Sequence, residues 1–358
     1  MRQDERVAVV MPSYRVRQHI LNVLDRIGDE VTKIYVVDDK CPEQSGQFVL
    51  DNCQDQRVTV LFHEVNQGVG GAVITGYKRA TEEGAAVIVK VDGDGQMDPA
   101  LIPEFVQPIL EGRADYTKGN RFYNPEDVQT MPLLRLVGNA LLSFMTKLSS
   151  GYWDIFDPTN GFTAISARLV RHLPLHKISR RYFFESDLLF RIGTFRACVL
   201  DVPMAAVYGT EQSNMQIVQI FPEFLGGNLK NFGKRLIYSY FLRDFSVASL
   251  QLVFGTLFLL FGTVFGTQAW IRSAVTGVTA STGTIMLAAL PVILGIQFLL
   301  SFIAFDFAAV PRRAIHPLLS VSPLRTRNDT TQDQPCTPQK PENDGRRSRS
   351  LGVSHEEN

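Results

Sequence analysis

The sequence has few cysteines and no net charge, and each of these features excludes a class of protein. Four cysteines occur among the 358 residues, and they are Cys41, Cys53, Cys198 and Cys336. Their wide spacing matches no metal site, and it fits a reducing compartment in which disulfides are rare. Lys plus Arg number 36, as do Asp plus Glu, so the formal net charge is zero. A protein that binds nucleic acid through bulk positive charge is therefore not expected.

The zero net charge is a sum over unlike regions. Residues 1–215 carry 23 basic and 27 acidic side chains, and residues 216–244 carry 4 and 2. Residues 245–311 carry one of each, and residues 312–358 carry 8 and 6. We predict a globular domain, a basic juxtamembrane segment, an apolar hairpin and a disordered tail in that order, because the polar tail cannot bury enough surface to offset its ordering entropy.

Charge is absent from two long segments in the third region. Phe245–Ile271 and Ser273–Phe305 contain no Asp, Glu, Lys or Arg. A helix needs about 20 apolar residues to cross a hydrocarbon core of about 30 Å, so the sequence predicts two transmembrane helices. A buried helical hairpin of a soluble protein is the alternative, but apolar runs of this length are rare in soluble cores.

The flanking charges predict how the hairpin is oriented. Basic residues lie before the first span and after the second, namely Lys230, Lys234, Arg235, Arg243, Arg312 and Arg313. The intervening loop has only Arg272, so both ends of the hairpin are expected on the cytoplasmic side. Met1–Arg6 is charged and precedes only a short apolar run, so no signal peptide is expected. The globular domain and both termini are therefore predicted to be cytoplasmic.

The juxtamembrane segment, residues 216–244, mixes apolar and basic residues at helical spacing. This pattern predicts amphipathic helices that lie on the cytoplasmic leaflet. For the first half of the segment, an ordinary surface helix of the globular domain is an equal alternative. The preceding polar stretch, Tyr208–Asn214, is predicted to be either a lid over the donor or a plain linker.

Residues 1–215 alternate β-branched runs with helical patterns. The runs at 7–11, 33–37, 58–63 and 87–91 end in turn or acidic residues, and helical patterns occupy segments between them. This alternation predicts an α/β fold with a mostly parallel, Rossmann-like sheet covered on both faces. Ligands bind such sheets at the carboxyl ends of the strands, so functional residues should follow the strands.

Polar clusters follow the first three runs. Met11-Pro-Ser-Tyr14 comes first, and Asp38-Asp39 next, where the acids could accept hydrogen bonds from a nucleoside or simply be solvated. Asn66-Gln-Gly68 opens a glycine-rich segment whose backbone N–H groups could approach a phosphate. A dinucleotide fingerprint would require glycine where Val73 stands, which makes a nicotinamide oxidoreductase the weaker alternative.

The cluster after the fourth run, Asp92-Gly-Asp94-Gly-Gln96, carries the strongest signal. Two carboxylates two residues apart can hold one hard divalent cation, and the glycines leave room for a diphosphate. Such an ion offsets the charge on a departing nucleoside diphosphate. The likeness to an EF-hand is superficial, because no Glu stands at the twelfth loop position.

Taken together, the motifs resemble glycosyltransferase family 2, which has the GT-A fold, and within it the polyprenyl-phosphate hexosyltransferases similar to dolichyl-phosphate mannose synthase. The residues that carry the resemblance are Pro12-Ser-Tyr14, Asp38-Asp39, Asn66-Gln-Gly68, Asp92-Gly-Asp-Gly-Gln96, Gly119-Asn-Arg121, Asn160-Gly-Phe162 and the two apolar segments. The resemblance covers about residues 5–310. It implies a metal-dependent, inverting transfer of a hexose from a nucleotide sugar to a polyprenyl phosphate at the cytoplasmic membrane face.

The resemblance also implies roles for individual residues. Those expected to bind the donor nucleotide are Pro12, Tyr14, Asp38, Asp39, Asn66 and Gly68. Asp92, Asp94 and Gln96 would hold Mg²⁺ or Mn²⁺ together with the donor diphosphate. The sequence departs from the family at Arg15, where many members have Asn.

Further residues are expected to meet the phosphates or the acceptor. Arg121 would bind a phosphate of donor or acceptor, and Arg135 and Asn139, one helical turn apart, would contact the lipid phosphate. The family more often has Ser at position 139, and an amphipathic surface helix is the alternative for Arg135. Glu185 and Asp187 would orient donor or acceptor, because an ionised polyprenyl phosphate needs alignment more than a general base.

Other functions fit parts of this pattern. A processive polysaccharide synthase would carry a Gln-x-x-Arg-Trp motif, which this sequence lacks. A non-processive transferase acting on another lipid or a glycan hydroxyl stays open. A non-catalytic membrane scaffold is disfavoured by the intact Asp92, Asp94 and Gln96. The sugar, the nucleotide, the lipid and a homo-oligomeric state are not determined by the sequence.

Overall fold

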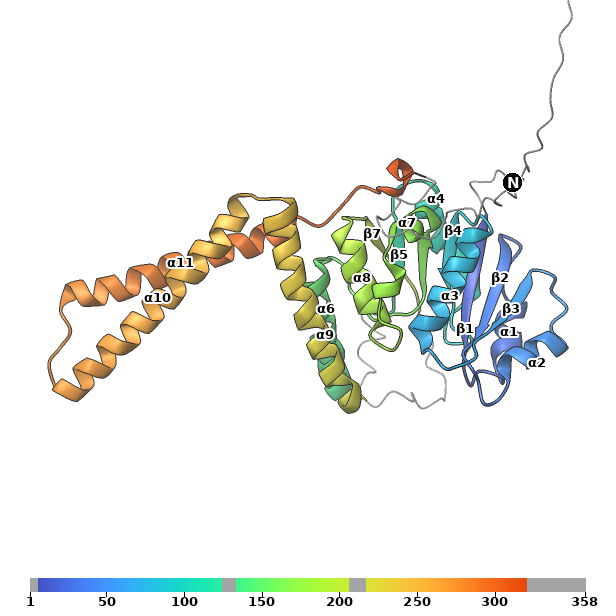
Figure 1. Cartoon of the computed structure of the whole chain (residues 1–358), viewed down its shortest axis with the longest axis horizontal. Helices are drawn as coiled ribbons and strands as arrows, with labels where there is room; N and C mark the ends of the chain where they lie inside the picture. Colours follow the sequence, from blue (N-terminus) through green and yellow to red (C-terminus); the bar gives the residue numbers. More distant parts are fainter. Residues whose placement is uncertain (1–5, 124–132, 206–216, 321–358) are drawn as a thin grey trace, which may run out of the picture. The chain divides into compact units, whose positions relative to one another are not determined.

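The computed structural model describes residues 6–123, 133–205 and 217–320 (Figure 1). In these residues seven strands form one sheet, in the order β3-β2-β1-β4-β6-β5-β7. The strands are β1 Val7–Ser13, β2 Val31–Asp38, β3 Val58–Phe62, β4 Val87–Lys90, β5 Tyr116–Asn120, β6 Thr163–Ser166 and β7 Val199–Pro203. β6 runs antiparallel to its two neighbours, and the other pairs are parallel. The predicted α/β fold with a mostly parallel sheet is confirmed.

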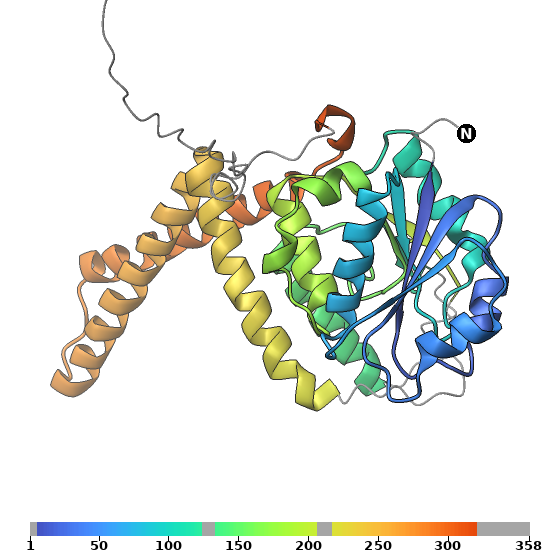
Figure 2. The ribbon, with the colours of Figure 1, turned by 45° about the vertical axis from the view of Figure 1, so that its right-hand side comes forward.

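Helices cover both faces of the sheet (Figure 2). They are α1 Ile20–Asp25, α2 Ser45–Asn52, α3 Val69–Glu82, α4 Ile102–Leu110, α6 Leu133–Ser150, α7 Ala167–His172 and α8 Phe184–Thr194, with short 3₁₀ helices η2 Pro99–Leu101 and η3 Leu175–Lys177. Alternate strand residues enter two separate cores, as the side-chain period of a strand requires. Val10 packs with α3, α7 and α8, whereas Val9 and Met11 pack with α1, α2 and α4.

Two long helices form the apolar hairpin. α10 spans Val247–Thr276 and α11 spans Thr282–Ala308, and both are long and apolar enough to cross a membrane, with mean hydropathies of 2.0 and 2.3. Small residues let the two helices approach closely. A Cβ at Gly295 would lie 2.7 Å from the Leu259 backbone nitrogen, and a Cβ at Gly262 would lie 2.8 Å from the Ala288 carbonyl oxygen.

One helix, α9 (Ile217–Ile237), and the π-helix η4 (Tyr238–Arg243) connect the sheet domain to the hairpin. Figures 1 and 2 show α9 lying beside α6, and α9 also contacts α8. Its polar side chains Asn228, Asn231 and Arg235 are buried, whereas Leu225 and Leu229 are 45% and 66% exposed. α9 therefore buries several polar side chains against the domain, and its outward face mixes the two leucines with the charged Glu223, Lys230 and Lys234.

The chain after the hairpin returns to the sheet domain. Val310 is buried in the core beside α7, Ile315 packs against that core, and residues 316–318 form the 3₁₀ helix η5 (His316–Leu318). The fully buried Asp115 carboxylate accepts the backbone N–H groups of Ile315 and His316 at 2.9 and 2.6 Å. Residues 312–319 are thus ordered, although the sequence predicted that they belong to a disordered tail. The contact with Asp115 is long-range, so no local sequence pattern indicates it. Residues 321–358 of that predicted tail lie outside the described residues.

Candidate active site

The carboxyl ends of β1, β2 and β4 bring three of the predicted polar clusters together. β1 lies between β2 and β4, with Ser13 paired to Asp38 and Val10 paired to Lys90. The loops after β1 and β4 touch, since a Cβ at Gly93 would lie 3.2 Å from the Val16 side chain. This edge of the sheet is where the sequence predicted the ligand to bind.

Asp39 organises the glycine-rich loop. Its carboxylate accepts the backbone N–H groups of Gln67 and Gly68, each at 2.7 Å, and the Asn66 amide donates to the Asp39 carbonyl oxygen at 3.0 Å. His63 Nδ1 lies 2.7 Å from Asp39 Oδ1, so a residue directly after β3 completes this group. The structure therefore joins Asp39, Asn66 and Gly68. The sequence analysis missed His63, although its position at a strand end was a usable signal.

Asp38, Pro12 and Tyr14 occupy different environments. The buried Asp38 carboxylate accepts the N–H groups of Cys41 at 2.8 Å and Gly46 at 2.6 Å, so it fixes the loop that follows β2. Pro12 is buried within β1. Tyr14 is 43% exposed, and its ring is therefore the one of the three that can stack on a ligand.

The two aspartates after β4 are only partly exposed. The Asp92 side chain is 27% exposed, and its Oδ1 atom lies 2.9 Å from the Lys90 ammonium but receives no hydrogen bond of good geometry from any described residue. The Asp94 carboxylate accepts the Gln96 backbone N–H at 3.0 Å, which folds the loop back on itself, and Gly95 takes φ of +79° to allow this turn. Gln96 itself is exposed.

A buried lysine links the aspartate loop to α8. Lys90 is 1% exposed, and its ammonium lies 2.9 Å from Asp92 Oδ1 and 3.4 Å from Glu185 Oε1. Burial alone would lower the pKa of Lys90, but the Asp92 and Glu185 carboxylates outweigh burial and raise it. Glu185 therefore belongs to the same charged group as Asp92. The sequence analysis missed Lys90, because a lysine at the end of a strand is usually exposed.

The floor of this group is formed by the segment before β6. Lys90 also donates to the Gly161 carbonyl oxygen at 3.2 Å, and the buried Lys118 ammonium donates to the Asn160 carbonyl oxygen. The Asn160 amide donates to the Gly119 carbonyl oxygen at 2.9 Å. Two motifs that are remote in sequence, Gly119-Asn-Arg121 and Asn160-Gly-Phe162, are thus held side by side under the aspartate loop.

Arg121 is held by a buried acid. Its Nε and Nη2 atoms donate to the Asp157 carboxylate at 2.7 and 3.1 Å, and Asp157 is fully buried. A bidentate pair of this kind fixes the plane of the guanidinium group. Arg121 follows β5 directly and keeps 32% of its side chain exposed.

The remaining predicted site residues lie away from the Asp92 group or outside the described residues. Asp187 accepts hydrogen bonds from the Ser179 N–H and the Asn231 amide, both at 2.9 Å, so its carboxylate joins α8 to α9 and does not reach the Asp92 group. Asn139 lies half-buried on α6. The Arg135 side chain and the segment Tyr208–Asn214 lie outside the described residues.

Comparison with known proteins identifies the family. The sequence pattern described as "Glycosyl transferase family 2" matches residues 8–173. The chain is also 32% identical over 224 residues to the UDP-N-acetylglucosamine–dolichyl-phosphate N-acetylglucosaminyltransferase of Methanococcus voltae, a match that covers 59% of this chain and 88% of that protein. The chain belongs to glycosyltransferase family 2.

Other relatives of this family 2 glycosyltransferase agree with the assignment. It is 28% identical over 206 residues to the undecaprenyl-phosphate mannosyltransferase of Micrococcus luteus, with 56% of this chain and 84% of that protein covered. Glucosyl-3-phosphoglycerate synthase of Mycobacterium tuberculosis, solved in complex with phosphoglyceric acid, superimposes with a TM-score of 0.51 at 20% identity. That match covers 64% of this chain and 80% of the solved chain, and it shows that the two proteins share a fold.

The carboxylates of the glycosyltransferase suit a divalent cation that takes its remaining ligands from a substrate. Within residues 6–123, 133–205 and 217–320, no group of three His, Cys, Asp or Glu side chains is placed to hold a metal ion. Asp92 and Asp94 offer two carboxylates, and Asp92 Oδ1 is a buried acceptor that no donor satisfies well. Mg²⁺ typically takes one or two protein carboxylates and completes its shell with phosphate oxygens and water. The residues present therefore suit an ion that arrives with a diphosphate.

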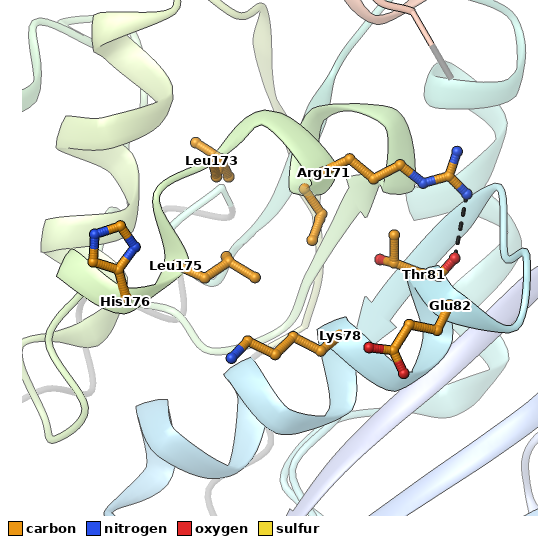
Figure 3. A pocket seen from close by; sticks show the side chains of 8 residues that line it. Lys78, Thr81, Glu82, Arg171, Leu173, Leu175 and His176 are labelled. Carbon is orange, nitrogen blue, oxygen red and sulfur yellow. Dashed lines mark hydrogen bonds between the residues drawn. The ribbon is translucent and has the colours of Figure 1, made fainter. Parts of the chain in front are cut away.

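A separate hollow of the glycosyltransferase lies away from this edge. A cavity of about 310 Å³ lies between α3 and the segment around α7 and η3, and in it Arg171 donates to the Thr81 carbonyl oxygen at 3.2 Å. Figure 3 shows the side chains that line it. Its other lining residues are Lys78, Glu82, Val170, Leu173, Leu175 and His176. None of the predicted donor or acceptor residues lines it, so size alone does not mark the active site of this enzyme.

A Gly161→Ala substitution in the glycosyltransferase is expected to lower transferase activity by about tenfold or more. A Cβ at this position would lie 2.6 Å from Lys90 Nζ and 2.7 Å from Asp92 Oδ2, so the Lys90 ammonium or the Asp92 carboxylate would have to move. Displacements near 1 Å at a reacting centre cost about a hundredfold in rate. Steady-state transfer rates measure the effect, with Gly138→Ala as the control because nothing lies within 4 Å of a Cβ there. Equal activity of the two variants would contradict the tight packing under Asp92.

Lys118 gives the glycosyltransferase a predictable pH dependence. Burial lowers the pKa of the Lys118 ammonium to about 8, against the opposing effect of Glu185 and Asp157. The same group in the unfolded chain has a pKa of about 10.4, so between these values the unfolded state binds more protons. The unfolding free energy of the wild type should therefore rise from about pH 8 to about pH 10 relative to Lys118→Met. Thermal unfolding of both proteins across this range tests it, and a constant difference would refute the shifted pKa.

Proposed function

We propose that this glycosyltransferase transfers a hexose from a nucleotide sugar to a polyprenyl phosphate at the cytoplasmic face of a membrane. The observation that carries the proposal is the outward face of α9, where exposed leucines stand beside the basic Lys230 and Lys234. Leu225 and Leu229 point outward on α9, and Val137 and Phe144 are 56% and 54% exposed on α6. Exposed apolar faces on adjacent helices are typical of proteins that lie on a membrane.

The acceptor follows from this surface and from the relatives. Relatives from Methanococcus voltae and Micrococcus luteus are named for dolichyl-phosphate and undecaprenyl-phosphate substrates. A lipid phosphate at the bilayer surface would approach Glu185, because α8, which carries this residue, contacts both α6 and α9. The two apolar helices α10 and α11, with basic residues at their domain ends, support an orientation in which both ends are cytoplasmic.

In this mechanism an oxygen of the lipid phosphate attacks the anomeric carbon, and the bond from that carbon to the nucleoside diphosphate breaks, with inversion. Tyr14 stacks on the donor base, and the Asp39-ordered loop presents backbone N–H groups beside it. Asp92, Asp94 and Gln96 would hold Mg²⁺ or Mn²⁺, which supplies positive charge to the departing diphosphate. Arg121, fixed by Asp157, neutralises phosphate charge where it develops.

The reaction itself is tested with labelled donors. Full-length protein in membranes would be incubated with UDP-glucose, UDP-N-acetylglucosamine or GDP-mannose, together with a polyprenyl phosphate and either Mn²⁺ or Mg²⁺. We expect one donor to yield a lipid-linked product that mild acid hydrolyses. Absence of such a product with every donor, or transfer only to a free glycan hydroxyl, would overturn the proposal.

The membrane surface is tested with a matched pair of variants. Leu225→Asp/Leu229→Asp places charge on the outward face of α9 and should lower transfer to a long-chain polyprenyl phosphate in vesicles by about tenfold, because two charges would enter the interface. With a short, water-soluble prenyl phosphate as acceptor, the variant should keep the transfer rate of the wild type. Leu50→Asp on α2, at a residue 53% exposed, is the control. Equal losses with both acceptors would argue against a membrane-facing α9.

A further inference from the structure

A second cavity lies where the sheet domain meets the apolar hairpin. It has a volume of about 300 Å³ and is lined by the ends of α6, α8 and α11 together with η4 and the residue that precedes α10. Three arginines line it, namely Arg196, Arg235 and Arg243. Phe224 of α9 packs against Phe183, two residues before Glu185, and Arg235 lies 11 residues further, or about 16 Å along the helix. The cavity is therefore distinct from the catalytic edge.

Its deepest arginine is fixed but not fully satisfied. Arg235 is 6% exposed and donates from Nη1 and Nη2 to the Asp306 carboxylate of α11 at 2.7 and 2.9 Å. The Trp153 indole N–H donates to the same carboxylate at 2.9 Å. The Arg235 Nε atom is buried and has no hydrogen-bond partner among the described residues. A buried donor without a partner costs free energy, so the guanidinium group of Arg235 is not fully compensated by Asp306.

The two outer arginines share one exposed carboxylate through long contacts. Arg196 and Arg243 share the Asp244 carboxylate at 3.4 and 3.3 Å, and that side chain is 53% exposed. These distances exceed those of strong charge-assisted hydrogen bonds, which are about 2.7–2.9 Å. Arg196 also stands at φ of +56°, a conformation that glycine adopts at lower cost. Arg243 Nη1 and Arg196 Nη2 also donate to the carbonyl oxygens of Thr194 at 2.7 Å and Ala309 at 3.3 Å. The N–H groups that face Asp244 can therefore exchange it for a better acceptor while these backbone contacts stay in place.

The surroundings of the cavity indicate what that acceptor is. Phe245 and Val247, on either side of the lining residue Ser246, are 67% and 69% exposed. The cavity thus opens at the end of the apolar hairpin, at the level expected for lipid headgroups. Basic pockets between membrane helices on the cytoplasmic side bind anionic headgroups. A volume of about 300 Å³ is at the small end of ligand pockets, which suits a headgroup but not its acyl chains.

We propose that this cavity binds the phosphate of an anionic membrane lipid headgroup through Arg196, Arg235 and Arg243. The acyl chains lie outside, along the exposed apolar side chains of α10. The site is separate from the acceptor site, and the proposal rests on the membrane placement proposed above. It gives the enzyme a contact with bulk anionic lipid that is independent of its substrates.

Lipid retention tests the site directly. Full-length protein would be reconstituted in nanodiscs of phosphatidylcholine with or without phosphatidylglycerol, released into mild detergent, and weighed by native mass spectrometry. We expect one phosphatidylglycerol to be retained, and Arg196→Gln/Arg243→Gln to lower that retention by about tenfold, since each charge-assisted hydrogen bond contributes appreciably. Arg79→Gln/Arg113→Gln, which removes the same charge from exposed ion pairs, is the control.

A variant that is expected to raise lipid retention distinguishes a lost binding site from a misfolded protein. Asp244→Asn removes the competing carboxylate and should raise phosphatidylglycerol retention severalfold, which a damaged protein would not do. Equal retention in the double variant and its control, or no gain with Asp244→Asn, would overturn the proposal. Inorganic phosphate is the second probe: if it raises the unfolding temperature in pure phosphatidylcholine as much as phosphatidylglycerol does, the ligand is a free anion and the lipid assignment is wrong. Transfer activity is recorded separately, so failure of this site is distinguishable from failure of the proposed reaction.

Discussion

A Lys90→Met variant is expected to lose about 3 kcal/mol of unfolding free energy and about a hundredfold in transfer rate. The ammonium of Lys90 lies between Asp92 and Glu185, so its removal leaves two carboxylates without their shared partner. Breaking a buried ion pair typically costs about 3–5 kcal/mol. The lower end applies because Asp92 stays 27% exposed. The rate falls because the aspartate loop loses the contact that orients it.

Thermal unfolding and steady-state transfer measure these two effects. A loss of about 3 kcal/mol corresponds to a fall of about 6–12 °C in the unfolding midpoint for a domain of this size. Lys33→Met, at an exposed lysine of β2, is the matched control and should change neither quantity. In the double variant Lys90→Met/Glu185→Gln, part of the stability should return, because one uncompensated charge is gone. Additive losses in the double variant would contradict the shared ion pair.

An Asp94→Asn variant is expected to lower metal-dependent transfer by about a hundredfold to a thousandfold, with little effect on stability. Asn keeps the oxygen that accepts the Gln96 N–H, so the loop fold is retained while one negative charge is lost. The expected loss is that of a group that stabilises charge in the transition state. Because a divalent cation is attracted by that charge, the Mn²⁺ concentration needed for half-maximal activity should rise.

The control for this variant lies four residues along the chain. Asp98→Asn removes a carboxylate that pairs with Arg26 at 2.6 Å, in a contact where both side chains are about half-exposed. Exposed ion pairs contribute about 0–1 kcal/mol, so this change should leave the Mn²⁺ dependence unaltered. Full Mn²⁺-dependent activity in Asp94→Asn, or equal effects in both variants, would refute the metal assignment at Asp94. Isothermal titration of Mn²⁺ in the presence of UDP provides a readout that does not depend on turnover.

Local patterns predicted the fold well. The β-branched runs became β1 to β4 within a few residues, and the polar clusters lie at their carboxyl ends as expected. Both features depend on neighbours in sequence. β-branched residues that can be buried on both faces of a sheet favour a strand, and the loop that follows a strand then lies at its carboxyl end. The two apolar helices were predictable for the same reason, since length and absence of charge suffice.

The contacts that complete the site were not predictable from one sequence. Glu185, which lies 3.4 Å from the Lys90 ammonium, and Asn160, whose carbonyl oxygen accepts from Lys118, come from distant segments, and nothing near either lysine indicates these partners. Helix geometry puts Asp187 and Glu185 on different sides of α8, but it does not indicate that Asn231 and Ser179 are the partners of Asp187. Asp115 and His316 are 201 residues apart. Such long-range pairs are set by the assembled fold, and local propensity does not record them.

The return of the chain to Asp115 has a consequence for biosynthesis. Val310 and Ile315 pack on the core of the sheet domain, and both are translated after the second apolar helix. That core is therefore incomplete when the ribosome has finished the sheet domain, and it closes only after α10 and α11 have been made. If these helices enter the membrane as proposed, their insertion precedes the last step in the folding of the catalytic domain.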